Sequence, residues 1–184
     1  MASRPENFAA VRDATDRHRA VHKCMAYPFD DGPLLTEFVR TRKPARILEI
    51  GAALGYSALS MAAGYEGSAV DTIERDPEHV RLAREWIGRF DMTGRITVIQ
   101  DDFLSALEGL DGLYDLVFFD GYAPTAELIS KLEGALAPSG AMLVTNLLLQ
   151  AKSDQFLTRL FGSAKWRLNY IDKSRNTACC VRLD

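Results

Sequence analysis

The fold is decided by the stretch Arg46-Ile47-Leu48-Glu49-Ile50-Gly51-Ala52-Ala53-Leu54-Gly55. Its first half is a short apolar run, which predicts a buried strand that stops at Gly51. The residues from Gly55 to Ala63 then favour a helix. Between the two, small residues allow a tight turn and let a ligand approach the backbone closely. The stretch therefore predicts a strand, a turn and a helix, which is the opening unit of an α/β sheet.

The same alternation continues to the C-terminus. Strands are predicted over residues 46–50, 69–74, 96–99, 116–119, 141–144, 166–171 and 178–183, and helices over residues 55–63, 77–90, 104–107, 124–136 and 154–161. Two more helices are expected before the first strand, and Pro138-Ser139-Gly140 and Lys173-Ser174-Arg175-Asn176 are typical of turns. We therefore predict an α/β fold: a Rossmann-like, seven-stranded, mostly parallel sheet with an antiparallel C-terminal hairpin and helices on both faces. Residues 1–184 are expected to form one domain, with an N-terminal helical cap over 1–45 and the Rossmann-like core over 46–184.

The composition is that of a globular protein. Of the 184 residues, 47% are hydrophobic and 26% charged. No run of about 18 apolar residues occurs, and the N-terminus lacks the apolar centre of a secretory signal. The odd number of cysteines, Cys24, Cys179 and Cys180, is a poor disulfide framework, and alternation in the last strand should place one of the adjacent pair inside. We expect a cytoplasmic protein with reduced thiols and no membrane association.

Acidic side chains concentrate in the middle of the chain. Residues 47–146 carry 16 acidic and 6 basic side chains, whereas the flanking segments are both net basic, and the whole chain has a formal net charge of -3. An acidic centre disfavours a phosphate backbone and suits a cationic ligand. Solvated helix faces would give the same count, so the charge alone leaves both readings open.

Polar residues follow the predicted strands at their carboxyl ends, where parallel sheets bind ligands. The residues at or just after these strand ends are Glu49, Gly51, Glu74, Asp101, Asp102, Asp120, Thr145 and Asn146, all polar except Gly51. Glu74 stands 23 residues after Gly51, where an acid can accept hydrogen bonds from both hydroxyls of a ribose. It could instead be an N-terminal acid of the helix that begins near Pro77. With Asp102-Phe103 placed to hold and cover an adenine, the pattern favours an adenosine-type ligand.

At this point the residues resemble a known family. The stretch from Ile47 to Ala58 resembles the first motif of class I S-adenosylmethionine methyltransferases. Its ending Gly55-Tyr56-Ser57 is similar to that of the catechol O-methyltransferase-like family of small-molecule O-methyltransferases. The spacing of Met25 and Gly32 resembles the same family, in which this segment lies over the methionine part of the cofactor.

The resemblance implies S-adenosylmethionine as the cofactor and a role for each matching position. Gly51, Gly55, Tyr56 and Ser57 would contact its methionine end, with Met25 to Tyr27 above them. Glu74, with Arg75 beside it, would hold the ribose, and Asp102, Phe103 and Tyr122 would frame the adenine. Glu49 and Asp120 complete the expected cofactor-binding set.

Two departures from the family concern its metal site and its catalytic lysine. The family binds the metal with an Asp after strand four and an Asp-Asn pair after strand five. Asp120 and Asn146 match, but Thr145 replaces the middle carboxylate, and Ala123 replaces the catalytic lysine. Since a hard cation needs charged oxygen ligands, we expect only a degenerate remnant of the site, made of Asp120 and Asn146.

Deprotonation of the acceptor would then need a protein base. Asp120 and Tyr122 are the catalytic candidates nearest the predicted site. His18 and His22, four residues apart, would share one face of a helix and are the alternative, although a solvated basic helix explains them equally well. His79 is expected at the surface.

Two classes of function remain open. The first is an S-adenosylmethionine-dependent methyltransferase that acts on a small molecule at a hydroxyl, with weak or no metal dependence. The second is a non-catalytic S-adenosylmethionine-binding protein. RNA methylation through the basic ends is less favoured because no aromatic residues are interleaved with them. A homodimer, frequent in the family, is an open alternative.

Overall fold

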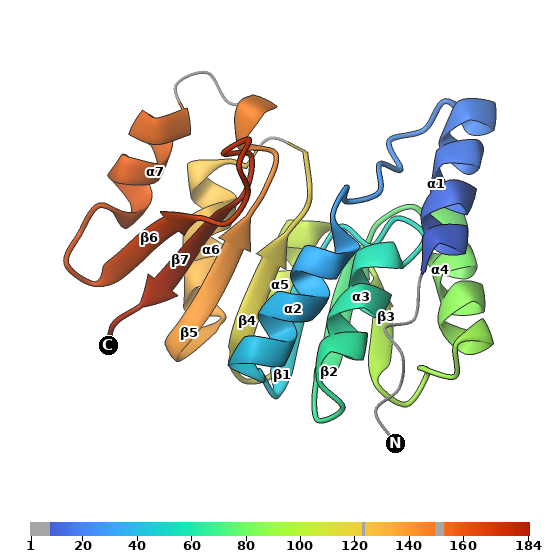
Figure 1. Ribbon diagram of the computed structural model, residues 1–184, viewed down its shortest axis with the longest axis horizontal. Coiled ribbons are helices and arrows are strands. Elements are labelled where there is room, and N and C mark those ends of the chain that lie inside the picture. The colour runs from blue at the N-terminus through green and yellow to red at the C-terminus, as the bar shows by residue number, and fades with distance from the viewer. Residues whose placement is uncertain (1–7, 123, 150–152) are drawn as a thin grey trace.

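The computed structural model describes residues 8–122, 124–149 and 153–184. Within them the strands form one seven-stranded sheet of order β3-β2-β1-β4-β5-β7-β6 (Figure 1). The strands are β1 (Arg46–Ile50), β2 (Ala69–Glu74), β3 (Ile96–Gln100), β4 (Tyr114–Phe119), β5 (Leu136–Val144), β6 (Trp166–Tyr170) and β7 (Ala178–Arg182). The first five are parallel, and β7 runs antiparallel to both β5 and β6. The predicted fold class is therefore confirmed.

Helices cover both faces of this sheet. They are α1 (Ala9–His22), α2 (Gly32–Arg42), α3 (Tyr56–Gly64), α4 (Pro77–Arg89), α5 (Phe103–Glu108), α6 (Ala126–Gly134) and α7 (Ser153–Phe161), with a short 3-10 turn η1 (Leu147–Leu149). The two helices predicted before the first strand are α1 and α2. None of the helices in the described part of the chain is both long and apolar enough to cross a membrane.

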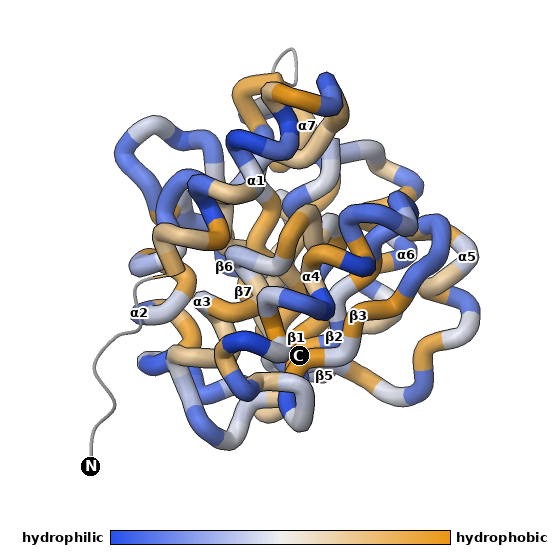
Figure 2. The backbone as a smooth tube through the Cα atoms, turned by 90° about the vertical axis from the view of Figure 1, so that its right-hand side faces the viewer, coloured by the Kyte–Doolittle hydropathy of each residue, from blue (hydrophilic) through white to orange (hydrophobic). Residues whose placement is uncertain are grey.

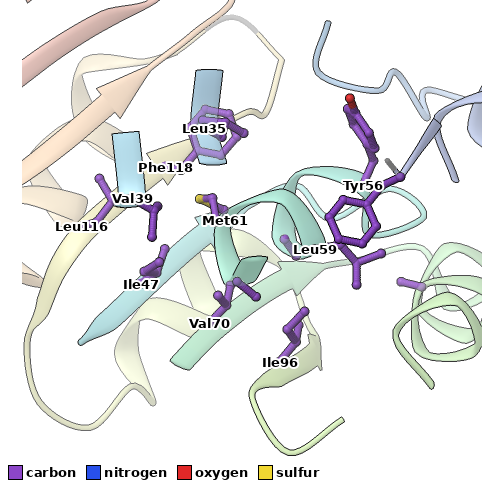
Figure 3. Close-up of a cluster of buried hydrophobic side chains, with 14 of the residues drawn as sticks. Leu35, Val39, Ile47, Tyr56, Leu59, Met61, Val70, Ile96, Leu116 and Phe118 are labelled. Atoms are coloured by element: carbon purple, nitrogen blue, oxygen red, sulfur yellow. The ribbon is translucent and has the colours of Figure 1, made fainter. Parts of the chain in front are cut away.

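The core consists of two apolar layers, one on each side of the sheet. In one layer α2, α3 and α4 pack on the sheet, as Figure 3 shows for Val39, Leu59 and Met61. In the other layer α5, α6 and α7 pack on the opposite face. The central strands β1 and β4 are buried along nearly their whole length because both of their faces are covered. Accordingly, hydrophobic colours concentrate on the strands at the centre of Figure 2.

Three sequence-based details were wrong. The helix expected from Pro124 begins at Ala126, because the Thr125 side chain accepts a hydrogen bond from the Leu128 backbone N–H and caps it. The turn expected at residues 138–140 lies inside β5, which pairs with β4 from Leu136 onward across an irregularity in the register. Cys179 and Cys180 are both buried, since β7 lies inside the sheet between β5 and β6.

The strand order reverses between β1 and β4. The chain runs outward from β1 to β2 and β3 on one side, and from β4 to β5 on the other. Such a switch point opens a crevice outside the carboxyl ends of the strands. In Figure 1 the segment between α1 and α2 crosses this carboxyl edge. The fold therefore brings residues 23–31 and the ends of β1, β2, β4 and β5 to one place.

Candidate functional site

The turn after β1 depends on its glycines. Gly51 has φ of +100° and Gly55 has φ of +92°, a region that residues with a side chain rarely adopt. A Cβ atom on Gly51 would also stand 2.9 Å from the backbone oxygen of Asp120. The Gly55 N–H donates to the Ala52 carbonyl over 2.7 Å and closes the turn. The turn is thus compact and lies directly against the end of β4.

Glu74 connects this turn to the end of β2. One carboxylate oxygen accepts from the Ala53 N–H and the other from the Asp76 N–H, each over 3.0 Å. The helix-capping role belongs to Asp76, whose side chain accepts from the first N–H groups of α4. Asp76, and not Glu74, therefore caps the N-terminus of α4. The buried carboxylate of Glu74 instead supports the turn at the carboxyl edge.

Glu49 is a carboxylate with no exposed surface. One of its oxygens accepts from the Thr72 hydroxyl over 2.5 Å, while Oε1 is buried and has no hydrogen-bond partner among the described residues. Burial raises the pKa of Glu49 to about 7, because a low-dielectric environment disfavours the charged form. A cationic group of a ligand would give Glu49 Oε1 the partner that the described residues do not provide.

Asp120 follows β4 at the switch point. Its backbone N–H donates to the Ile50 carbonyl over 2.9 Å, which fixes it beside the end of β1. The pKa of Asp120 lies well above its usual range, first because the carboxyl group is desolvated and second because Glu49 is close. Asp30, from the segment before α2, adds a further negative charge. Asp120 is therefore a carboxyl group that attracts a proton more strongly than an exposed one.

The metal-binding pattern of the family does not fit the geometry found here. The Asn146 side chain turns its amide nitrogen toward Asp120 Oδ1 at 3.2 Å and toward the Gly121 carbonyl at 2.6 Å. The Thr145 hydroxyl is buried and pairs with the Thr177 hydroxyl at 3.0 Å. Of the three positions, only Asp120 offers a carboxylate oxygen, whereas a magnesium ion requires several oxygen ligands.

Tyr56 and Ser57 are buried, and this explains part of the Met25–Gly32 pattern. A Cβ atom on Gly32 would stand 2.5 Å from the Tyr56 hydroxyl, so the close packing of α2 on α3 requires glycine there. Figure 3 labels Tyr56 within the same buried cluster as Leu59. The Tyr56 side chain is thus held in the helix interface.

Several predicted cofactor contacts are exposed side chains on the segments around the edge. Met25, Tyr27 and Tyr122 are largely exposed, as is Arg75. The guanidinium of Arg19 lies 4.3 Å from the centre of the Tyr27 ring and holds that ring from α1. Because these side chains are exposed, they can contact a ligand without any change in the packing of the core.

The two residues expected at the adenine have different environments. Asp102 is exposed and caps α5 by accepting from the Leu104 N–H over 3.0 Å. Phe103 is half-buried, and its ring lies 3.6 Å from the position that a Cβ on Gly121 would occupy. The structure thus brings Phe103 next to the Gly121-Tyr122 segment.

The expectation that His79 lies at the surface was wrong. Its side chain is 7% exposed, and Nδ1 lies 3.8 Å from Glu74 Oε1. Glu74 raises the pKa of His79 to about 9. The helical period contained the missed signal: His79 precedes Ala83 by four residues and Ile87 by eight, and both of these are buried. His18 and His22 do share one face of α1, with their ring centres 4.3 Å apart.

Comparison with known proteins agrees with this geometry. A sequence model of the family described as O-methyltransferase matches residues 2–126, more than half of the chain. The chain belongs to the O-methyltransferase family. The resemblance inferred from the first motif is therefore confirmed, and the matched residues include the Gly51 turn, Glu74 and Asp120.

Individual relatives of the family match over part of their length. The chain is 34% identical to a catechol O-methyltransferase of Mycobacterium tuberculosis over 74% of this chain and 61% of the relative. It is 33% identical to the O-methyltransferase ankF of Aspergillus thermomutatus over 50% of this chain and 39% of the relative. The chain thus spans about two fifths to three fifths of these curated relatives.

A solved structure shows the same fold. The O-methyltransferase TomG of Streptomyces achromogenes, in complex with SAM, superposes with a TM-score of 0.83 at 20% identity and covers all of this chain and 93% of its own. At this identity the likeness concerns the fold alone.

Proposed function

We propose that this chain is an S-adenosylmethionine-dependent methyltransferase that acts at a hydroxyl of a small molecule, with weak or no dependence on a divalent metal. The match of the O-methyltransferase family model over residues 2–126 carries the proposal, because it includes the turn and the acids of the carboxyl edge. The proposed cofactor-binding residues are Met25, Tyr27, Glu49, Gly51, Gly55, Tyr56, Ser57, Glu74, Arg75, Asp102, Phe103, Asp120 and Tyr122.

The donor set at the edge suits this cofactor. The bound cofactor would supply a methyl group on a positively charged sulfur. Glu49 lies close enough to Asp120 to raise its pKa, and Glu49 Oε1 has no hydrogen-bond partner in the described part of the chain. A cation between them relieves their repulsion. Glu74 still has acceptor capacity on both oxygens for ribose hydroxyls after its two backbone hydrogen bonds.

Asp120 is the base that we propose for the reaction. Transfer of a methyl group from the bound cofactor to the acceptor hydroxyl would release the hydroxyl proton, and a protein base would have to accept it. The raised pKa of Asp120 makes its carboxylate a stronger base than an exposed aspartate, and Asn146 fixes its orientation through Oδ1. Tyr122 is exposed next to it and is the second candidate. Positioning of the acceptor supplies the rest of the acceleration.

The weak metal dependence rests on two observed hydrogen bonds. In this arrangement the Thr145 hydroxyl pairs with Thr177, and Asn146 directs its amide nitrogen, a donor, toward Asp120.

A second candidate function is cofactor binding without catalysis. The observation that favours it is the same loss of metal ligands, together with the replacement of the family's lysine by Ala123, which lies outside the described residues. RNA as the acceptor is disfavoured because the carboxyl edge gathers acidic groups.

We further propose that residues 1–184 fold as one domain, with 1–45 as the cap, and that the protein is cytoplasmic. The three free cysteines support a reducing compartment. A homodimer is also proposed, and size-exclusion chromatography with light scattering would test it.

Turnover tests the main proposal. The purified chain is incubated with S-adenosylmethionine and a panel of hydroxyaromatic acceptors, and formation of S-adenosylhomocysteine is followed with and without EDTA. We expect turnover of at least one acceptor, with a rate that EDTA leaves unchanged. Cofactor binding without turnover of any acceptor would favour the non-catalytic function, and loss of turnover in EDTA would contradict the metal-free mechanism.

A further inference from the structure

Three metal-ligand side chains meet outside the proposed acceptor site. They come from separate elements: His18 from α1, Cys24 from the segment that follows it, and His79 from α4. One ligand atom of each lies within 4.8 Å of those of the other two. His18 and Cys24 are half-buried, and His79 is buried. The first two are only six residues apart, but the third is 55 residues further along the chain, so the fold assembles the cluster.

His79 supplies a second, independent observation. Its side chain is 93% buried, and its Nε2 atom has no hydrogen-bond partner in the part of the chain that the structure describes. The nearest acidic oxygen to Nε2, from Asp76, is 4.0 Å away, too far for a hydrogen bond. A buried ring nitrogen without a partner is energetically costly, so His79 Nε2 would be stabilised by a bound ligand that the described residues do not supply.

We propose that His18, Cys24 and His79 form a binding site for a zinc-type divalent cation. Two imidazoles and a thiolate are borderline and soft ligands, which select zinc over magnesium or calcium. Tetrahedral zinc with bonds of about 2.0–2.3 Å places its ligand atoms roughly 3.3–3.8 Å apart, so small side-chain rotations close the present cluster onto the ion. Water would take the fourth position, as in sites with three protein ligands.

The surroundings of the cluster favour a cation. Glu74 faces Nδ1 of His79 at 3.8 Å, which is the place of the outer carboxylate that orients a metal-bound histidine. Asp76 and Glu78 lie near His18 and add negative charge. His22 stacks on the His18 ring and supports it from the next turn of α1.

Occupation of this site would affect the proposed cofactor edge without taking part in the reaction. The ion would join α1 and Cys24 to α4, and so fix the start of the segment that crosses the carboxyl edge to α2 (Figure 1). It would do so beside Glu74, which also supports the Gly51–Gly55 turn. The site thus stands apart from Asp120 and Asn146, and its existence does not depend on the proposed activity.

The plain alternative is that the cluster needs no metal. In that case a protonated His79 pairs with Glu74 within the fold, and His18 and His22 form a stacked pair near the surface. This alternative predicts no binding of a thiophilic cation.

Cobalt spectroscopy separates the two. The untagged, reduced chain is freed of metal and titrated with Co²⁺, and we expect one equivalent to give a sulfur-to-cobalt charge-transfer band and the intense visible bands of tetrahedral cobalt. Zn²⁺ should displace the cobalt, whereas Mg²⁺ should not. Cys24→Ser, a conservative change at a half-buried position, should abolish the charge-transfer band. It should also weaken Zn²⁺ binding by more than the roughly 10–100-fold typical of removing an outer partner.

His22→Ala is the matched control, because it removes a neighbouring imidazole of the same helix and leaves the three ligands. It should keep the band and the stoichiometry. Absence of the band in the wild-type chain, an unchanged band in Cys24→Ser, or loss of the band in His22→Ala would each overturn the assignment. None of these results depends on methyl transfer, so failure here leaves the proposed function untouched.

Discussion

The two sides of the switch point differ in how many of the family's site residues they keep. Between β1 and β2, the glycine turn and Glu74 keep both the residues of the family and hydrogen bonds that hold them at the edge. Between β4 and β5, Asp120 is kept, but Thr145 is tied to Thr177 inside the fold and Asn146 donates where a metal would need an acceptor. The chain thus keeps the geometry expected of a cofactor side and lacks that of a metal side.

This difference separates two tasks of the site, cofactor binding and deprotonation of the acceptor. Cofactor binding needs backbone shape and buried carboxylates, and both are present. Deprotonation of an acceptor without a metal needs a basic group, and Asp120, whose pKa is raised by burial and by Glu49, can provide one. Four substitutions test this comparison.

The largest effect is expected from Asp120→Asn, which removes the proposed base. The value of kcat should fall by about 10²–10⁴-fold, the usual contribution of a general base, with a smaller change in cofactor affinity. Asp115→Asn is the matched control: Asp115 lies near the start of β4, the strand that Asp120 follows, and its carboxylate accepts from the Ala45 and Arg46 N–H groups at that opposite end. Steady-state kinetics of both variants give their kcat values. An unchanged kcat in Asp120→Asn would exclude Asp120 as the base.

Gly51→Val tests the backbone shape of the cofactor side. The positive φ and the contact at 2.9 Å with the Asp120 backbone oxygen should together cost about 2–4 kcal/mol, seen as weaker cofactor binding and a lower melting temperature. Gly88→Ala has nothing within 4 Å of its new Cβ and should leave cofactor affinity as it is. Wild-type affinity in Gly51→Val would mean that the turn is not part of the site.

Glu49→Gln tests the buried charge through the pH dependence of stability. A carboxyl group whose pKa rises from 4.5 to about 7 on folding stabilises the protein fully at low pH, and this contribution is lost as pH rises through about 7. Wild type should therefore lose up to roughly 3 kcal/mol from this group between pH 4.5 and 7, at about 1.4 kcal/mol per pH unit. The variant should lack this part of the slope.

Urea denaturation from pH 4.5 to 8 measures the slope. Glu66→Gln, at an exposed position, should behave as wild type. Parallel curves for Glu49→Gln and wild type would show that Glu49 ionises as an ordinary carboxylate.

The smallest effect is expected from Glu74→Ala. Loss of charged hydrogen bonds to a ribose should weaken cofactor affinity by roughly 1–3 kcal/mol. Glu85→Ala removes an exposed acid of α4 and serves as the control. Calorimetry measures the cofactor affinity of both variants. Their melting temperatures are compared as well, because Glu74 also accepts a hydrogen bond from the Ala53 N–H and its loss can destabilise the fold. Equal affinity would remove Glu74 from the site.

Much of the fold followed from local patterns. The apolar run before Gly51 and the repeated strand–helix alternation are properties of short segments, so they predicted the sheet and the carboxyl edge correctly. The start of β5 was missed because it depends on pairing with Tyr114, more than twenty residues earlier in the chain.

The details of the site depend on partners far apart in sequence. The Thr145–Thr177 pair joins the residue after β5 to the residue before β7. The burial of His79 arises because α1 and α4 pack together, with Phe8 against Phe90 at 4.9 Å and His18 against His79 at 5.3 Å. A motif within one segment cannot predict such contacts, because each partner lies in a different part of the chain. The pKa of Asp120 is likewise raised first by desolvation within the fold and then by Glu49 and Asp30, which lie on other segments of the chain.

Calorimetric titration with S-adenosylmethionine shows whether the cofactor side of the edge binds its ligand without a metal. The titration is done on the wild-type chain after removal of metal, first with EDTA and then with added Mg²⁺. We predict one binding event of the same affinity in both conditions. No binding in either condition, or binding that appears only with Mg²⁺, would contradict the account.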